Sequence, residues 1–111
     1  PFIATSEARA SDEYKQGIVA GGAGDIVNSS LFTGISGNYL RGSIVAAGLD
    51  PDKLEGAGPD AMNFESASGA KAWRDIWGSG QGIGAIKKVV PTAELVARLA
   101  VEFEAAKARL A

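Results

Sequence analysis

The sequence has 111 residues, a formal net charge of −2 and an apolar fraction of 46%, values that are ordinary for a globular domain. The charge gives no electrostatic reason to expect nucleic acid as a partner, and no apolar run is long enough to predict a membrane span. Without cysteine there are no disulfides and no thiolate chemistry, and without histidine the commonest general base and metal ligand are missing. We therefore expect a cytoplasmic protein that binds neither nucleic acid nor membrane.

The first residue is Pro1, and Met62 is the only methionine. Because this is not a natural translation start, we expect the sequence to be a fragment of a longer chain. A chain of this length can still bury roughly 65% of its unfolded surface, which is enough for a core.

The first predicted elements are the end of a strand at residues 2–4 and, after a turn, a short amphipathic helix. Ser11 is a good N-cap for this helix, and Gly21 is a typical stop signal. Tyr14 and Ile18 fall on one face at helical spacing, so this face is expected to be buried.

Residues 25–33 are rich in β-branched and aromatic side chains and are predicted to be extended. Gly34 and Gly37 predict a turn after them. Residues 39–45 then suggest a short helix that ends at Gly48.

Residues 49–70 contain two prolines and several glycines without a sustained period, and we predict a long loop there. Loops of this length are usually lids, binding loops or linkers, although a solvated connection is the simpler interpretation.

The clearest prediction is a C-terminal helix that begins near Pro91 and runs to the end of the chain. It has one apolar face and one charged face, and Glu94 with Arg98 and Glu104 with Lys107 are expected to pair. The apolar face requires a partner.

Residues 73–86, WRDIWGSGQGIGAI, combine two tryptophans with four glycines. Such glycines either permit turns with positive φ or let a partner approach the backbone closely. Gly80, Gly82 and Ala85 match the dinucleotide pattern GxGxxA, but no apolar strand precedes them and Pro91 soon follows. A glycine-rich helix packed tightly on its neighbours is therefore the favoured interpretation.

Two further groups of polar residues have ordinary explanations. Tyr14 and Lys15 do not face each other on a helix, so Lys15 is expected to be solvated rather than half of an acid–base pair. Asp50 and Asp52 flank Pro51, and a turn explains them better than a calcium loop because the glycine and glutamate of such a loop are absent.

Three blocks, FIATSEA, DIVNSSLFTGISGNYLR and KAWRDIWGSGQGIGAI followed by PTAELVARL, together resemble the C-terminal part of nitronate monooxygenases, formerly called 2-nitropropane dioxygenases. The resemblance implies an α/β fold: this chain would be the C-terminal fragment of an FMN-binding TIM-type (β/α)8 barrel. The piece itself would be mostly α-helical with one or two short strands. The intact enzyme would oxidise alkyl nitronates with O₂.

The resemblance also implies where the groups of the site lie. Pro1 and Phe2 match the last positions of a Gly-Thr-x-Phe turn that helps to hold the FMN phosphate, so the rest of that turn and the catalytic histidine would lie upstream. Within this chain we assign no catalytic and no metal-binding residue. The partner would be the missing N-terminal part of the same barrel, and residues 1–111 would be inactive alone.

The stretch that remains for the site is the glycine segment. The resemblance places Gly80 and Gln81 beside the flavin, and Gly78 and Ser79 beside the substrate. Some relatives have a serine at the position of Gly78, so Ser79 or a backbone group would have to replace it here.

Two alternatives stay open at this stage. The first is an FMN-dependent enoyl reductase that takes its electrons from a nicotinamide cofactor. The second is not an enzyme but a small helical interaction module whose exposed apolar face recruits a partner.

Overall fold

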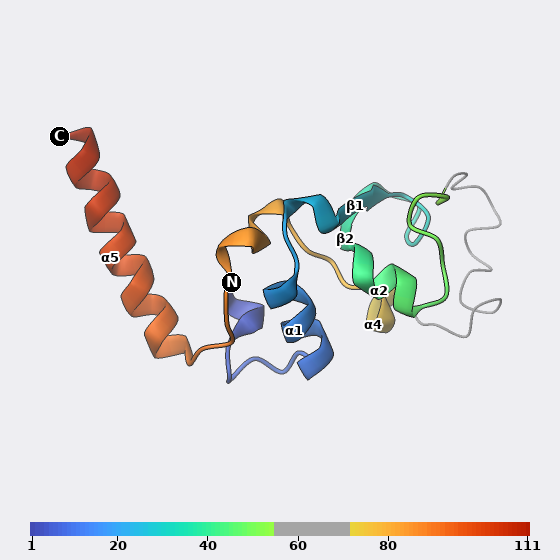
Figure 1. Cartoon of the computed structure of the whole chain (residues 1–111), viewed down its shortest axis with the longest axis horizontal. Coiled ribbons are helices and arrows are strands. Elements are labelled where there is room, and N and C mark those ends of the chain that lie inside the picture. Colours follow the sequence, from blue (N-terminus) through green and yellow to red (C-terminus); the bar gives the residue numbers. More distant parts are fainter. Residues whose placement is uncertain (55–71) are drawn as a thin grey trace.

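The computed structural model describes residues 1–54 and 72–111. Within them the chain is rich in short helices and has one two-stranded antiparallel sheet (Figure 1). This confirms the predicted piece of mostly helical structure with one or two strands. The elements in chain order are η1 Phe2–Ala4, α1 Asp12–Ala20, η2 Ala23–Asp25, β1 Ile26–Ser29, β2 Gly37–Leu40, α2 Arg41–Ala46, α4 Ala72–Asp75, η4 Gln81–Ala85 and α5 Thr92–Leu110.

The sheet separates two clusters of apolar side chains. Strands β1 and β2 pair Ile26 with Leu40 and Val27 with Tyr39. Because side chains alternate along a strand, each of these pairs lies on its own face of the sheet. One face packs with Ala4, Ile18, Ile83 and Ile86, and the other packs with Ile44 and Ile76.

The predicted strand at residues 2–4 is wrong, because Phe2–Ala4 forms the 3₁₀ turn η1. The Ala4 N–H donates to the Pro1 carbonyl at 3.1 Å, and the Thr5 hydroxyl donates to the Phe2 carbonyl at 2.7 Å. These local hydrogen bonds oppose an extended conformation. The chain becomes extended only at Thr5, which forms an isolated parallel bridge with Val90.

Helix α1 confirms the predicted amphipathic helix and its start. The Ser11 hydroxyl accepts a hydrogen bond from the Tyr14 N–H at 3.2 Å, and Gly21 follows the last turn. The expectation for Lys15 is wrong, since this residue is only 6% exposed. The apolar residues Tyr14 and Ile18 predict only one buried face for α1. Lys15 is buried as well, in a helix that also packs against the turn η1.

In the middle of the chain the structure confirms the predicted extended segment and moves the start of the predicted helix. Strand β1 lies within the predicted extended segment, whereas Tyr39 and Leu40 belong to β2 rather than to the following helix. Their pairing with β1 outweighs the local helical spacing. Gly34 and Gly48 have φ values of +81° and +85°, so the turn and the helix end that they were predicted to make both use left-handed backbone.

The predicted loop at residues 49–70 lies largely outside the described residues, which end at residue 54 before the gap. The described part confirms a turn at Pro51. The Lys53 N–H donates to the Asp50 carbonyl at 3.1 Å, and Arg41 pairs with Asp52 at 3.0 Å.

Helix α5 confirms the C-terminal helix, with Pro91 as its N-cap rather than its first residue. It extends away from the other elements (Figure 1). Leu95 is its buried residue, while Val101 is 70% exposed. The Glu94–Arg98 pair is wrong because Glu94 pairs with Lys88 and Arg98 with Glu102, whereas the predicted pair of Glu104 with Lys107 is present.

The N-terminal segment fastens the start of α5. The Ser6 N–H donates to the Val90 carbonyl at 2.9 Å, and the Val90 N–H donates to the Ala4 carbonyl at 3.3 Å. The Glu7 carboxylate then accepts from the Thr92 N–H at 3.0 and 3.1 Å. A carboxylate at this position satisfies a free backbone donor of the helix and complements its dipole.

None of the helices in the described part of the chain has the length and apolar character needed to cross a membrane.

Replacing Leu95 by alanine should destabilise the protein by about 2–4 kcal/mol because a buried side chain is removed. The matched control on the same helix is Val101→Ala, which should change the stability by less than about 0.5 kcal/mol because that residue is exposed. Urea unfolding measures both free energies. Equal effects of the two substitutions would contradict the anchoring of α5 through Leu95.

The hydrogen bonds from Thr92 lower the pKa of Glu7 below its ordinary value. The stabilisation that accompanies this shift is present above the pKa of the unfolded chain and is lost as the pH falls through the lower folded pKa. Urea unfolding of the wild type and Glu7→Gln over a series of acidic pH values should therefore show a steeper acid loss in the wild type. Parallel curves would refute the capping role.

Candidate functional site

The backbone at residues 77–79 runs beside β2 as a short extended stretch. The Leu40 N–H donates to the Trp77 carbonyl at 2.8 Å, and the Ser79 N–H donates to the Asn38 carbonyl at 3.1 Å. Gly78 lies between them, in an antiparallel bridge with Tyr39. The glycine segment is thus attached to the sheet at its beginning.

Trp77 is held on several sides. Its backbone N–H donates to the Ser43 hydroxyl at 3.0 Å, which itself donates to the Leu40 carbonyl at 2.7 Å. The indole N–H donates to the Arg74 carbonyl at 2.9 Å. The indole ring stacks on the Tyr14 ring, with the centroids 5.0 Å apart and the planes 6° from parallel.

Tyr14 connects α1 to the glycine segment. Its hydroxyl donates a hydrogen bond to the Gly78 carbonyl, although the two residues are separated by 64 positions in the sequence. Burial raises the pKa of Tyr14 above its ordinary value. Neutral Tyr14 is the form that can donate this hydrogen bond, so burial favours the state that makes the contact.

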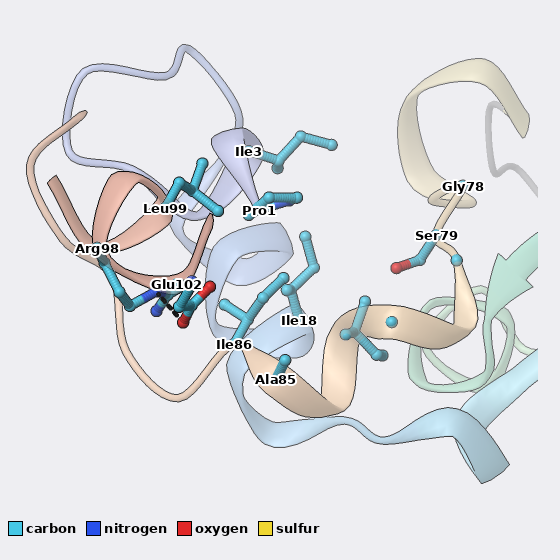
Figure 2. A pocket seen from close by; sticks show the side chains of 13 residues that line it. Pro1, Ile3, Ile18, Gly78, Ser79, Ala85, Ile86, Arg98, Leu99 and Glu102 are labelled. Carbon is cyan, nitrogen blue, oxygen red and sulfur yellow. Dashed lines mark ion pairs between the residues drawn. The ribbon is translucent and has the colours of Figure 1, made fainter. Parts of the chain in front are cut away.

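A cavity of about 340 Å³ lies beside the glycine segment. Figure 2 shows it between η1 and α1, the glycine segment and the first half of α5. The residues that line it are Pro1, Ile3, Ile18, Gly78, Ser79, Gly80, Gly82, Ile83, Ala85, Ile86, Arg98, Leu99 and Glu102.

Most of the cavity wall is apolar. Its polar side chains are the Ser79 hydroxyl and an ion pair between Arg98 and Glu102, whose nitrogen and oxygen atoms are 3.4 Å apart. In Figure 2 the Ser79 hydroxyl is directed from the glycine segment toward the side on which Ile3 and Ile18 lie. An apolar wall with a few placed polar groups is the usual form of a small-molecule site.

Within the protein, the four glycines of this segment neither adopt positive φ nor allow close packing of a neighbouring element. None of them has a positive φ, and a Cβ added at Gly80, Gly82 or Gly84 would meet nothing within 4 Å. At Gly78 the nearest atom would be the Asn38 carbonyl oxygen, 3.8 Å away. A helix packed tightly through its glycines is therefore wrong, and these glycines expose the backbone toward open space.

The dinucleotide pattern does not have the required context. The five-residue 3₁₀ helix Gln81–Ala85 follows the short extended stretch at residues 77–79, where a long helix preceded by a central strand would be needed.

The structure brings together three of the four predicted site residues. Gly78, Ser79 and Gly80 line the cavity, whereas Gln81 is exposed and does not line it. The roles predicted for them at the flavin and at the substrate stay predictions.

Sequence reasoning missed the cavity-lining residues of η1, α1 and α5, among them Ile3, Arg98 and Leu99. It also missed the contact of Tyr14 with Gly78. These groups come from separate elements, and no spacing in the sequence places them together.

A second cavity of about 370 Å³ is lined by Trp77 and by residues of α1 and α2. Glu13 and Asp25 are the charged residues that line it. The Asp25 carboxylate already accepts from the Gly22 N–H at 2.9 Å. In residues 1–54 and 72–111 no group of three or more acidic side chains could hold a metal ion.

Neither a protein-family model nor a curated protein matches this sequence significantly. The structure is similar to that of a mutant of FabK from Thermotoga maritima, with a TM-score of 0.66 and 22% sequence identity over 98% of this chain. The chain spans about a third of that protein, 33% of its length. This similarity shows that the chain has the fold of a part of FabK.

The stacked position of Tyr14 generates a prediction about its titration. The chain has two tyrosines, so Tyr39→Phe leaves Tyr14 as the remaining phenol. Phenolate absorbance of the folded variant should titrate above the ordinary tyrosine pKa of 10.0, since burial raises the pKa of Tyr14. The associated stabilisation is present below the unfolded pKa and is lost as the pH rises through the folded one.

The same variant unfolded in urea is the control for this titration. Identical titration curves for the folded and unfolded variant would contradict the burial of Tyr14 against Trp77.

Proposed function

We propose that this chain is part of an FMN-dependent oxidoreductase built on a TIM barrel, and that residues 78–86 form a wall of the flavin site. The observation that carries the proposal is the structural similarity to FabK over 98% of this chain. FabK is an FMN-dependent enoyl-ACP reductase with a TIM barrel. A TIM barrel needs eight strands and about 250 residues, so the rest of the barrel would come from outside these 111 residues.

The cavity suits part of a flat aromatic cofactor. Its volume of about 340 Å³ falls at the lower end of the range for small-molecule sites. Ile18 of α1 and Ile83 and Ile86 of the glycine segment supply apolar surface. The glycines of the same segment that line the cavity add backbone that carries no side chain. A planar ring can lie against such a backbone at van der Waals distance.

The residues of this chain would have distinct roles around the ligand. Gly80 would lie against the cofactor within the cavity, and Gly78 and Ser79 would contact the substrate. Gln81 is exposed outside the cavity wall and would hold the cofactor from there. The Ser79 hydroxyl can donate one hydrogen bond to a substrate oxygen. Bound FMN would supply the redox chemistry, which no side chain of this sequence provides.

For the reaction we propose the oxidation of alkyl nitronates by O₂. The support comes from the three sequence blocks that resemble nitronate monooxygenases, including the glycine segment that lines the cavity. A nitronate is a small anion whose oxygens accept hydrogen bonds, and it suits the single hydroxyl on the apolar wall.

A second candidate keeps the barrel and the cofactor but changes the reaction. The similarity to FabK supports reduction of an enoyl thioester. For this reaction we propose a nicotinamide cofactor as the source of electrons. Both reactions need the same flavin and differ in the substrate and in the source of electrons.

One assay of the complete product of this gene, loaded with FMN, separates the two reactions. We expect O₂ uptake with propyl nitronate and no oxidation of NADH in the presence of a crotonyl thioester. The opposite result would establish the reductase and refute the nitronate reaction. Failure to retain FMN would refute the flavoenzyme itself.

A substitution at Ser79 tests whether the cavity is the site of this reaction. Ser79→Ala should lower kcat/KM for the nitronate by about 10-fold, since one hydrogen bond to a charged ligand is lost. Ser36→Ala is the matched control, because Ser36 is exposed and does not line the cavity. Equal rates for the wild type and Ser79→Ala would remove Ser79 from the site.

A further inference from the structure

The glycine segment needs a side chain from elsewhere in the fold to fix its position. Beyond Ser79, a Cβ at Gly80, Gly82 or Gly84 would meet nothing within 4 Å, so no side-chain contact fixes the segment at these three positions. Ile83 and Ile86 hold the later part of the segment in the apolar core, so the position of the part that carries Ser79 depends on the contacts of residues 77–79.

At this end the backbone groups alternate in direction. The Trp77 carbonyl and the Ser79 N–H both face β2, where they bond to Leu40 and Asn38. In an antiparallel arrangement the groups of the residue between them point the other way. The Gly78 carbonyl therefore lies on the free edge of the extended stretch, where pairing with β2 cannot satisfy it.

Tyr14 is the residue that meets this carbonyl. Its hydroxyl donates to the Gly78 oxygen, while its ring lies flat on the Trp77 ring with centroids 5.0 Å apart. The stack limits where the hydroxyl can move. Trp77 is itself fixed through Ser43 and Arg74. Helix α1 thus holds both Trp77 and the following residue.

We propose that Tyr14 is a positioning residue for the cavity: its hydroxyl fixes Gly78 and thereby sets where Ser79 and Gly80 stand against a bound ligand. Tyr14 does not line the cavity and touches no ligand in this arrangement. The effect of Tyr14 on ligand binding rests on the proposed function, with FMN as the ligand. Its effect on the position of Gly78 rests on the geometry alone.

Tyr14→Phe tests the proposal because it removes the hydroxyl and keeps the stacked ring. Amide hydrogen exchange in the complete gene product should become about 3- to 10-fold faster at Ser79, whose N–H bonds to Asn38. The Leu95 amide, bonded to Pro91 in α5, is the internal reference. A loss of global stability alone would accelerate both amides, whereas the proposed role affects Ser79 alone.

The second measurement is the affinity for FMN of the deflavinated protein, followed by quenching of flavin fluorescence. Tyr14→Phe should weaken FMN binding by about 3- to 10-fold. Tyr39→Phe is the matched control, since it removes a phenol hydroxyl that makes no contact with the Gly78 carbonyl, and it should leave both measurements unchanged.

The outcomes separate the two proposals. Unchanged exchange at Ser79 in Tyr14→Phe, or the same change in Tyr39→Phe, would overturn the positioning role. Faster exchange with unchanged FMN affinity would overturn its importance for the ligand. If the wild type bound no FMN, the proposed function would fail, and the exchange comparison would still decide whether Tyr14 positions the segment.

Discussion

The attachment of residues 77–79 to the edge of β2 is the interaction on which the rest of the structure depends. It brings Trp77 between the sheet and α1, where the indole joins the larger apolar cluster. It also fixes the start of η4, whose Ile83 packs in the same cluster with Ile86. Without this attachment the glycine segment would lose its reference to the sheet, and the cavity would lose one wall.

Local signals in the sequence predicted the helices better than the strands. Helix α1 has a capping serine and a terminal glycine, and α5 has nineteen residues of helical pattern after Pro91, so both could be found without tertiary information. The local pattern predicts a helix for part of strand β2 because Tyr39 and Leu40 have helical spacing with Ile44. Their strand conformation comes from pairing with β1, which a local pattern cannot show.

The candidate site shows the same division. The unusual composition of residues 73–86 was enough to single out the segment that lines the cavity, and three of the four predicted residues do line it. The role of its glycines could not be read from composition, because close packing, positive φ and open backbone all use glycine. The contact of Tyr14 with Gly78 joins residues 64 positions apart, so it follows only from the folded chain.

The central claim is that the cavity beside residues 78–86 receives the flavin, and chemical-shift mapping with glycine-labelled complete gene product tests it most directly. On addition of FMN, the amide signals of Gly78, Gly80 and Gly82 should shift, because these residues line the cavity. Gly42 lines the other cavity and should not shift. Shifts at Gly42 without shifts at the other three, or no shifts at all, would contradict the claim.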